Sequence, residues 1–331
     1  MFIITSEFGI VNHHLGGNHM YRDKDKLAIN VAKLYYRSDY SQQKIAQELG
    51  VSRPSISRLL QYAKDKGYVN IQIVDPVEDM SHMEQRLKDK LHLKDVKIAS
   101  STINDEEEIK KYIGIAAARY LDTIIKDGDI IGVGWGTTLY NMSQALVPKA
   151  IKGSQVVQLE GGVSHSEWNN YAREILESFA ANFDTVAQYL PLPVIFDTKE
   201  TKELVDRDRY IKRVLELGRH ANIAIFSVGT VRPNALFFRL GYTGIEEQEK
   251  IQKSSVGDIC SRFFDVEGRI CNRDLDDRTV GITLSELRDK EFSIMISGGE
   301  AKINAIKAAL KGRYANVLIT DQFTGKALLE D

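Results

Sequence analysis

Short apolar runs alternate with amphipathic segments over most of this chain, from residue 94 to residue 331. Six runs predict buried strands, because they are rich in Val and Ile and too short for core helices: DVKIAS (95–100), DIIGVGW (129–135), SQVVQLEGG (154–162), ANIAIFSVGT (221–230), EFSIMISGG (291–299) and ANVLITD (315–321). Helical periodicity fills the intervals 107–125, 137–146, 171–183, 209–220 and 301–310. This alternation favours an α/β fold, in which a mostly parallel sheet carries helices on both faces.

A different pattern lies upstream, in SQQKIAQELGVSRPSISRLLQYAKDKG (41–67). Ile45, Ala46 and Leu49 would share one face of a first helix. A second helix is indicated by the i, i+3, i+4, i+7 spacing of Ile56, Leu59, Leu60 and Ala63. Gly50 suits the left-handed residue that ends the first helix, and Ser52 suits the N-cap of the second. Two short helices joined in this way make a helix-turn-helix.

The polar residues of the second helix then face outward, where they could contact phosphates and base edges in a DNA major groove: Ser52, Arg53, Ser55, Ser57, Arg58 and Gln61. An ordinary helical hairpin with a solvated face is the alternative. The flanking sequence favours DNA binding over the ordinary hairpin. The pattern of residues 27–35 predicts a further amphipathic helix, and that of residues 67–74 predicts a strand that could serve as a wing. Residues 20–70 also carry ten Lys or Arg against five Asp or Glu, in a chain of net charge −2.

The length of 331 residues suits two or three domains. We expect a disordered leader over 1–19, with Met20 as a candidate native start, and a winged helix-turn-helix domain over 20–75. A linker helix within 76–93 and an α/β effector domain over 94–331 would follow. The linker carries one apolar stripe, which could pair with a second chain or pack on its own domain: Met80, Met83, Leu87 and Leu91.

Composition argues against several classes of protein. No segment approaches the ~18 apolar residues of a membrane span, and no secretory signal is visible. Cys260 and Cys271 are the only cysteines and lack the spacing of metal ligands. We therefore expect a cytoplasmic protein with free thiols, with no metal and no membrane attachment.

Glycine follows four of the apolar runs, in GVGWGTT (132–138), LEGGVSHS (159–166), SVGTV (227–231) and SGGEAK (297–302). In an open α/β sheet, ligands bind beyond the carboxyl ends of the strands, where glycine lets backbone N–H groups and helix N-termini approach an anion. The candidate residues at these turns are Gly134, Gly136, Thr137, Thr138, Gly161, Gly162, Gly229, Gly298, Gly299 and Lys302. They predict a phosphate pocket, and ordinary tight turns are the alternative. Neither a Walker lysine motif nor a dinucleotide fingerprint is present, so no cofactor is expected.

Taken in order, YYRSDYSQQKIAQELGVSRPSISRLLQYAKDKGYV, GVGWGTTLY, VVQLEGG, VGDICSRFFD and SGGEAK resemble the SorC family of bacterial transcription regulators, and most of all its deoxyribonucleoside-regulator branch. The resemblance implies a winged helix-turn-helix joined to a Rossmann-like domain of the sugar-phosphate isomerase type. It implies a homodimer or homotetramer that binds double-stranded operator DNA and a phosphorylated sugar. Phosphate contacts are implied for Gly134, Gly136, Thr137, Thr138 and Lys302, and sugar contacts for Gly161, Gly162 and Asp258.

One position departs from this branch, whose members have a lysine directly after VVQL, where this chain has Glu160. A carboxylate cannot form the imine that a lysine could form with an open-chain sugar. It could accept hydrogen bonds from sugar hydroxyls, or simply face water at a loop edge. We expect a repressor of sugar or deoxyribonucleoside catabolism genes, without catalytic residues. The alternative is a sugar-phosphate isomerase-like enzyme with Glu160, Asp258 or Asp265 as general base.

Overall fold

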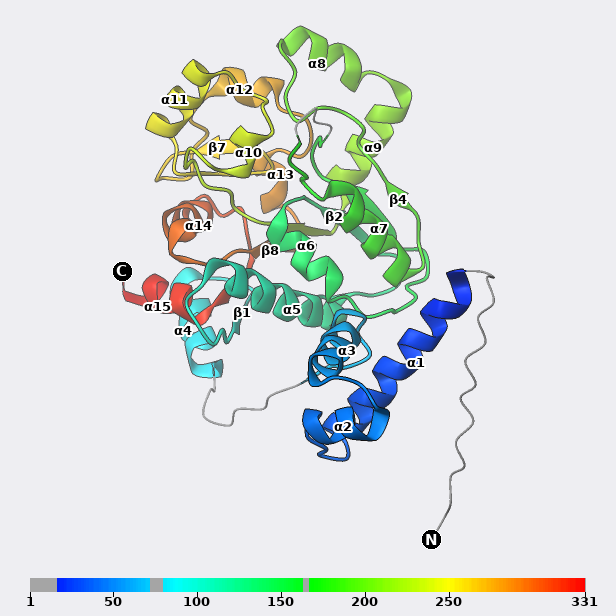
Figure 1. Ribbon diagram of the computed structural model, residues 1–331. Coiled ribbons are helices and arrows are strands. Elements are labelled where there is room, and N and C mark those ends of the chain that lie inside the picture. The colour runs from blue at the N-terminus through cyan, green and yellow to red at the C-terminus, as the bar shows by residue number, and fades with distance from the viewer. Residues whose placement is uncertain (1–16, 72–79, 163–166, 331) are drawn as a thin grey trace. The chain divides into compact units, whose positions relative to one another are not determined.

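The computed structural model describes residues 17–71, 80–162 and 167–330, with side chains from residue 24 onward (Figure 1). The chain divides into two compact units, residues 1–76 and 77–331. Each unit has its own hydrophobic core. Within the described ranges, no helix is long and apolar enough to cross a membrane.

The smaller unit contains the helices α1 (Gly17–Tyr36), α2 (Gln42–Leu49) and α3 (Arg53–Asp65). Gly50 ends α2 in the left-handed conformation, with φ of 64°, and the Ser52 side chain accepts the Ser55 N–H at the start of α3. The helices share a core of small and branched residues: Ala28, Val31, Ala32, Ile45, Ala46, Ile56, Leu60 and Ala63. The two short helices expected over 41–67, and the residues that end and begin them, are confirmed.

Three details of this unit differ from expectation. Leu49, expected on the shared apolar face of the first helix, is 39% exposed and adds little to the core. No strand forms over 67–71, because the N–H groups of Tyr68 and Val69 bond back to the Ala63 carbonyl, and 72–74 lie outside the described residues. Of the expected leader, 1–16 lie outside the described residues, whereas 17–19 belong to α1.

The larger unit is built on a seven-stranded sheet. Its strands are β1 (Asp95–Ala99), β2 (Ile130–Val133), β3 (Gln155–Gln158), β4 (Ala187–Gln188), β5 (Ile223–Phe226), β8 (Phe292–Ile296) and β9 (Val317–Asp321). Every pairing is parallel, in the order β1-β9-β8-β5-β2-β3-β4. The α/β fold and all six predicted strands are confirmed. The two-residue β4 is too short to leave a sequence pattern and was not predicted.

The strand order reverses between β2 and β5. From β2 the chain moves outward to β3 and β4, and it then returns to place β5 on the other side of β2, before β8 and β9 extend the sheet further. The chain thus leaves these two neighbouring strands in opposite directions. In open α/β sheets such a reversal opens a crevice at the carboxyl ends of the strands.

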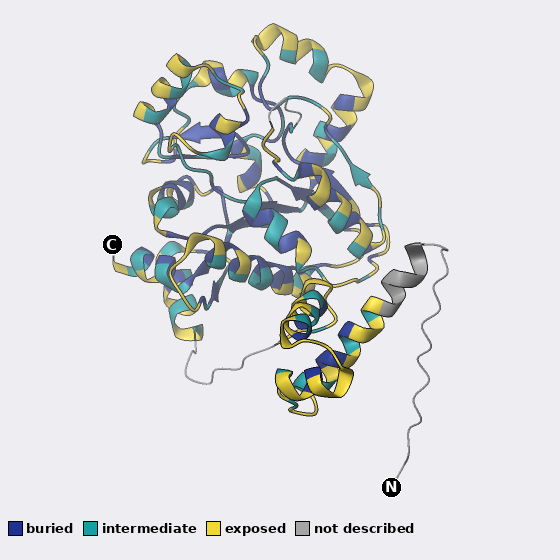
Figure 2. Ribbon diagram, in the orientation of Figure 1, coloured by how far each residue is buried: buried dark blue, intermediate teal, exposed yellow. Residues whose placement is uncertain are grey.

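Successive residues of the central strands point to opposite faces of the sheet. Ile223 and Ile225 join the core cluster beneath α5 (Glu106–Ile124), α6 (Thr137–Gln144) and α7 (Ala172–Phe183), whereas Ala224 and Phe226 join the cluster on the other face. That face is covered by α4 (Ser81–Leu91), α9 (Arg209–His220), α14 (Ile303–Lys311) and α15 (Gln322–Glu330). Burial on both faces (Figure 2) explains why the strands are continuous apolar runs.

Short elements form a lobe beyond the carboxyl edge of the sheet. They are α8 (Lys199–Asp206), α10 (Leu236–Arg239), α11 (Ile245–Ser254), α12 (Arg273–Arg278) and the antiparallel hairpin of β6 (Gly257–Ile259) and β7 (Arg262–Phe264). The short helix α13 (Leu284–Arg288) follows this lobe and packs on the sheet, with Leu284 and Leu287 in the same core cluster as Phe226. The buried Arg262 guanidinium donates to the Asp276 carboxylate and to the carbonyls of Asp276, Thr279, Gly281 and Ile282. This one side chain therefore joins the hairpin to the segment 276–282.

The helix expected as a linker, α4, packs on the larger unit. Its Leu87 is fully buried in one cluster with Val96 and Ile98 of β1 and Leu328 of α15. Met80 and Met83 pack against the same cluster. Of the two interpretations of this apolar stripe, packing on its own domain is the one observed.

We expect Leu87→Ala to lower the free energy of unfolding of the larger unit by about 2–5 kcal/mol, the usual cost of emptying a filled core position. Chemical denaturation followed by tryptophan fluorescence measures this, because Trp135 and Trp168 both lie in the larger unit. Leu204→Ala is the control, since Leu204 on α8 is 67% exposed and its loss should change little. Equal midpoints for Leu87→Ala and the wild type would remove α4 from this core.

Candidate functional site

The polar residues predicted to contact DNA extend from the N-cap of α3, Ser52, to Gln61 in its third turn. Arg53, Ser57, Arg58 and Gln61 are exposed, and Ser55 is half-buried. The Ser52 hydroxyl accepts the Ser55 N–H at 3.3 Å, so it is engaged as the helix cap. Arg58 Nη2 donates to Ser55 Oγ at 3.4 Å, and Gln61 Nε2 donates to Asp65 at 2.8 Å. α3 thus presents two arginines and several hydroxyl and amide groups on one exposed helix.

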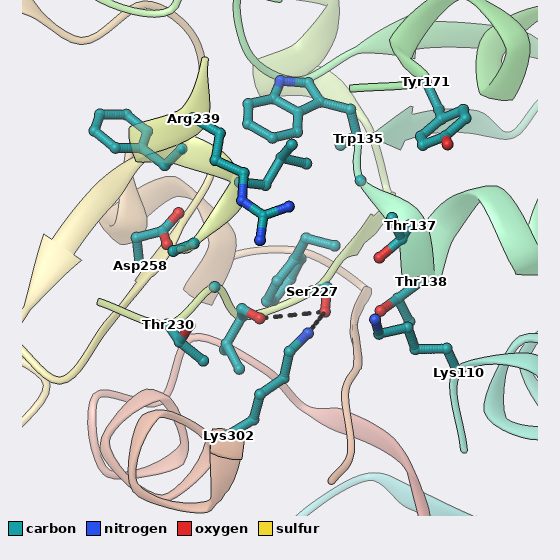
Figure 3. A pocket seen from close by; sticks show the side chains of 18 of the residues that line it. Lys110, Trp135, Thr137, Thr138, Tyr171, Ser227, Thr230, Arg239, Asp258 and Lys302 are labelled. Carbon is teal, nitrogen blue, oxygen red and sulfur yellow. Dashed lines mark hydrogen bonds between the residues drawn. The ribbon is translucent and has the colours of Figure 1, made fainter. Parts of the chain in front are cut away.

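A cavity of about 460 Å³ lies at the carboxyl ends of β2 and β5, where the strand order reverses. Its wall comes from the loops after these strands, the start of α5, α10, the β6–β7 hairpin and the turn before α14 (Figure 3). The size suits one small molecule. Among the residues lining it are these sequence-predicted ones: Gly134, Gly136, Thr137, Thr138, Glu160, Gly229, Asp258 and Lys302.

One side of the cavity has the features of an anion site. Thr137 and Thr138 begin α6, and Gly136 before them has a φ of 118°, which favours glycine. No side chain caps this helix, so its N-terminal partial positive charge is available to an anion. Lys302 ends the 3₁₀ turn Glu300–Lys302, and its Nζ donates to Ser227 Oγ at 3.3 Å. Burial, with a further contribution from Lys110, lowers the pKa of Lys302 to about 8.

Lys110 is a second cation of the cavity, which the sequence did not reveal. Its Nζ lies 2.9 Å from a carboxylate oxygen of Glu106 and 2.8 Å from one of Glu107. All three residues lie in the first turns of α5 and line the cavity. The charge of Lys110 is therefore balanced within its own helix before any ligand binds.

Two carboxyl groups also line the cavity, those of Glu160, which is buried, and Asp258, which is half-buried. Ser261 Oγ donates to Glu160 Oε2 at 2.9 Å, and the Ser261 N–H donates to Asp258 Oδ2 at 3.2 Å. Burial raises the pKa of Glu160 to about 8, although the Ser261 hydroxyl lowers it. Burial raises the pKa of Asp258 to about 6, against the lowering effects of the Ser261 N–H and Lys302. Near pH 7 the pair therefore holds about one proton.

The turn that carries Ser261 has an uncommon backbone. Cys260 and Ser261 are the two central residues of the β6–β7 hairpin, and their φ angles are 49° and 62°. Such turns favour Asn and Gly, and a non-glycine residue in this region costs roughly 1–3 kcal/mol. Opposite the turn, a Cβ on Gly229 would lie 2.0 Å from Asp258 Oδ1. The left-handed turn holds Ser261 between the two carboxyl groups, and glycine at position 229 leaves room for that of Asp258.

Four predicted glycines are not among the residues that line the cavity: Gly161, Gly162, Gly298 and Gly299. The Gly299 N–H donates to Asp321 Oδ2 at 3.0 Å and to Thr324 Oγ1 at 2.8 Å, so it is directed at its own unit and not at a ligand. The N–H groups of Gly161 and Gly162 donate to backbone carbonyls of neighbouring segments. A Cβ on Gly161, Gly162 or Gly298 would clash with neighbouring atoms, so glycine permits close packing there, whereas Gly299 has a φ of 92°, which favours glycine.

Several cavity residues escaped the sequence analysis. Trp135 follows β2, and its indole N–H donates to the Gly161 carbonyl at 2.8 Å. Figure 3 shows Arg239 extending from α10 into the cavity, and its guanidinium carbon lies 4.5 Å from the centre of the Trp168 ring. Of these residues, only Trp135 lies within a motif that the sequence analysis singled out, GVGWGTT. Arg239 belongs to a four-residue helix that leaves no periodicity in the sequence.

These groups can bind a small anion that also carries hydroxyl groups. The helix end, the threonine hydroxyls and Lys302 suit the anionic part, and the carboxyl pair suits hydroxyl donors. Over the described ranges, no cluster of His, Cys, Asp and Glu could hold a metal ion. Cys260 also lines the cavity, but burial and then Glu160 raise the pKa of its thiol, which is therefore a poor nucleophile.

Comparison with known proteins gives related sequences over almost the whole chain. The sugar-binding domain family (Sugar-bind) matches residues 75–330. The deoxyribonucleoside regulator of Bacillus subtilis (strain 168) is 51% identical over 312 residues, which cover 94% of this chain and 100% of that protein. The sorbitol operon regulator of Klebsiella pneumoniae is 32% identical over 314 residues, which cover 93% of this chain and 99% of that protein.

Comparison of the fold with solved structures gives the same group of proteins. The crystal structure of the full-length sorbitol operon regulator SorC from Klebsiella pneumoniae is similar, with a TM-score of 0.70 and 29% sequence identity. The similarity covers 93% of this chain and 99% of that chain. The resemblance seen in the motifs is thereby confirmed, and the chain belongs to the SorC-type family of transcriptional regulators with a sugar-binding domain.

Proposed function

We propose that this protein represses genes of sugar or deoxyribonucleoside catabolism, and that a phosphorylated sugar bound in the cavity controls its binding to operator DNA. The observation that carries the proposal is the meeting of the α6 N-terminus, Thr138 and Lys302 at the reversal of strand order. A phosphate there would gain charge-assisted hydrogen bonds in a partly dehydrated site. Relatives named as deoxyribonucleoside and sorbitol operon regulators support the same class of effector.

The charge state of the carboxyl pair also supports a phosphorylated effector. Two ionised carboxylates beside a phosphate dianion would oppose its binding. A protonated Glu160 removes one of these charges, while Asp258 remains available to accept hydrogen bonds from sugar hydroxyls. The cavity thus combines a site for an anion with a hydrogen-bond acceptor for sugar hydroxyls. Because one of the two carboxyl groups is uncharged, the pair repels a bound phosphate less.

On the DNA side, α3 is the proposed recognition helix. Its exposed arginines, Arg53 and Arg58, would contact the duplex, with Ser55, Ser57 and Gln61 at phosphates or base edges. We also propose a cytoplasmic homodimer or homotetramer, because helix-turn-helix modules gain affinity by docking on two half-sites. The sugar phosphate would act as an effector by binding one arrangement of this oligomer more tightly than the other.

The isomerase-like alternative has less support. Asp265, one of its three candidate bases, is not among the cavity-lining residues, and its carboxylate accepts the N–H groups of Glu267 and Arg269. Glu160 is hydrogen-bonded to Ser261, and its carboxyl is mostly protonated near pH 7, unlike a ready general base. The relatives above are named regulators and not enzymes.

For the DNA contact, we expect Arg53→Ala and Arg58→Ala each to weaken operator binding by ~1–3 kcal/mol and to relax sequence preference at one position. Fluorescence anisotropy at fixed salt, with an operator selected from random duplexes, measures both effects. Lys26→Ala on α1 is the control, because it removes the same charge from outside α3. Unchanged affinity in both arginine variants would show that α3 is not the recognition helix.

For the effector, we expect Lys302→Ala to reduce the affinity for a phosphorylated sugar roughly tenfold to hundredfold, since a charge-assisted hydrogen bond contributes ~1.5–3 kcal/mol. Thr138→Val should act in the same direction. Titration of the protein–operator complex with the sugar phosphate measures release of DNA, and Lys326→Ala, an exposed lysine on α15, is the charge-matched control. Wild-type responses from Lys302→Ala and Thr138→Val together would place the effector elsewhere.

The protonated state of Glu160 is open to test without any effector. The folded protein keeps the Glu160 proton up to about pH 8, whereas the unfolded chain loses it near the ordinary value of 4.5. Between pH 6 and 8 the folded state therefore binds more protons than the unfolded state, so the free energy of unfolding falls as pH rises. We expect this fall, at most about 1.4 kcal/mol per pH unit, to be smaller in Glu160→Gln. Parallel curves for the two proteins in urea denaturation would mean that Glu160 is already ionised at pH 6.

A further inference from the structure

Ser261 links the carboxyl groups of Glu160 and Asp258 in the cavity. Its side chain donates to Glu160 and its backbone N–H donates to Asp258, and Ser261 itself is 1% exposed. In the described part of the chain, neither carboxyl forms an ion pair. Lys302 lies near enough to attract Asp258, and the backbone N–H of Trp135 and the Cys260 thiol also bond to Glu160. An ionised Asp258 keeps acceptor sites toward the cavity, and a protonated Glu160 has an O–H to donate.

Asp258 lies away from the anion site, whereas the Glu160 carboxyl lies beside the Gly134–Trp135 turn that leads into α6. Figure 3 shows Asp258 on the opposite side of the cavity from Thr137 and Thr138, with Lys302 between the two sides. A sugar whose phosphate lies at the α6 N-terminus therefore passes Glu160 and extends its other end toward Asp258. In a terminally phosphorylated aldose, that end carries the oxygens of C1 and C2.

We propose that Glu160 and Asp258, positioned together by Ser261, bind the hydroxyl groups at the non-phosphorylated end of the sugar, so that the cavity selects a sugar phosphate with a C2 hydroxyl over its 2-deoxy counterpart. The inference rests on the proposed function, because it takes a phosphorylated sugar as the occupant. Two carboxyl groups fixed side by side, one an acceptor and one with an O–H to donate, match hydroxyls on neighbouring carbons, and a 2-deoxy sugar leaves one of these hydrogen-bonding groups unpaired. The selectivity holds even though a deoxyribonucleoside regulator is 51% identical to this chain.

The test compares matched pairs of sugar phosphates on the full-length protein by isothermal titration calorimetry. The probes are ribose 5-phosphate and 2-deoxyribose 5-phosphate, glucose 6-phosphate and 2-deoxyglucose 6-phosphate, and inorganic phosphate alone. In at least one pair, we expect the 2-hydroxy sugar to bind roughly tenfold to hundredfold more tightly than the 2-deoxy sugar. The affinity for inorganic phosphate should be the same in the wild type and in the variants described below.

Three variants separate this role from a structural one. Asp258→Asn and Glu160→Gln keep the side-chain shapes and should reduce the ratio of the two affinities, with most of the loss on the 2-hydroxy sugar. Ser261→Gly keeps the left-handed backbone and the N–H bond to Asp258 while removing the hydroxyl, so it should lower the same ratio by a smaller factor. Asp289→Asn, an exposed residue at the end of α13, is the matched control and should leave the ratio unchanged.

The outcomes are distinct. Equal affinities within both pairs, tighter binding of the 2-deoxy sugars, or a ratio that none of the three variants changes would each overturn the inference while leaving sugar-phosphate binding in place. If none of the four sugars binds but another phosphorylated sugar raises the melting temperature, the inference fails and the proposed function stands. If no phosphorylated sugar binds, both fail.

Discussion

The reversal of strand order between β2 and β5 is the constraint on which the rest of the larger unit depends. Because every pairing in the sheet is parallel, all strands deliver their carboxyl ends to one edge. Because the chain leaves β2 and β5 in opposite directions, no covering helix closes the space between them. The Gly136 turn and the Ser227–Thr230 loop therefore meet across a cavity, and the lobe around the β6–β7 hairpin supplies its remaining wall.

The charged side chains of that cavity form three separate groups. Lys110 is balanced by carboxylates of its own helix, Lys302 is held with a lowered pKa, and the Glu160–Asp258 pair shares about one proton near pH 7. Burial costs each ionised group solvation, and a ligand that carries phosphate and hydroxyls would replace part of the lost water on both sides.

Much of the larger unit was predictable because its strands are buried on both faces and so read as continuous apolar runs, of which DIIGVGW and EFSIMISGG are clear cases. The anion side of the cavity was predictable for a related reason, since Gly136, Thr137 and Lys302 follow directly after such runs. The lobe was not, because α10 and the hairpin are too short to show periodicity, and Arg239 and Ser261 lie on them. Gly299 shows a further limit: sequence alone does not reveal whether an N–H after a strand faces a ligand or a carboxylate such as Asp321, 22 residues away.

The contact between Gly229 and Asp258 has a consequence for how a site like this can change its ligand. A methyl group at position 229 would overlap the carboxyl oxygen that it faces, so any side chain there would push Asp258 out of place. Substitutions at 160 and 258 change side chains without altering this loop, whereas a residue at 261 must accept the left-handed φ of 62°. The preference for one sugar over another can therefore change through the exchange of a few side chains, while the loops keep their conformation. New ligand specificities can arise in this way without a change in the strands that support the loops.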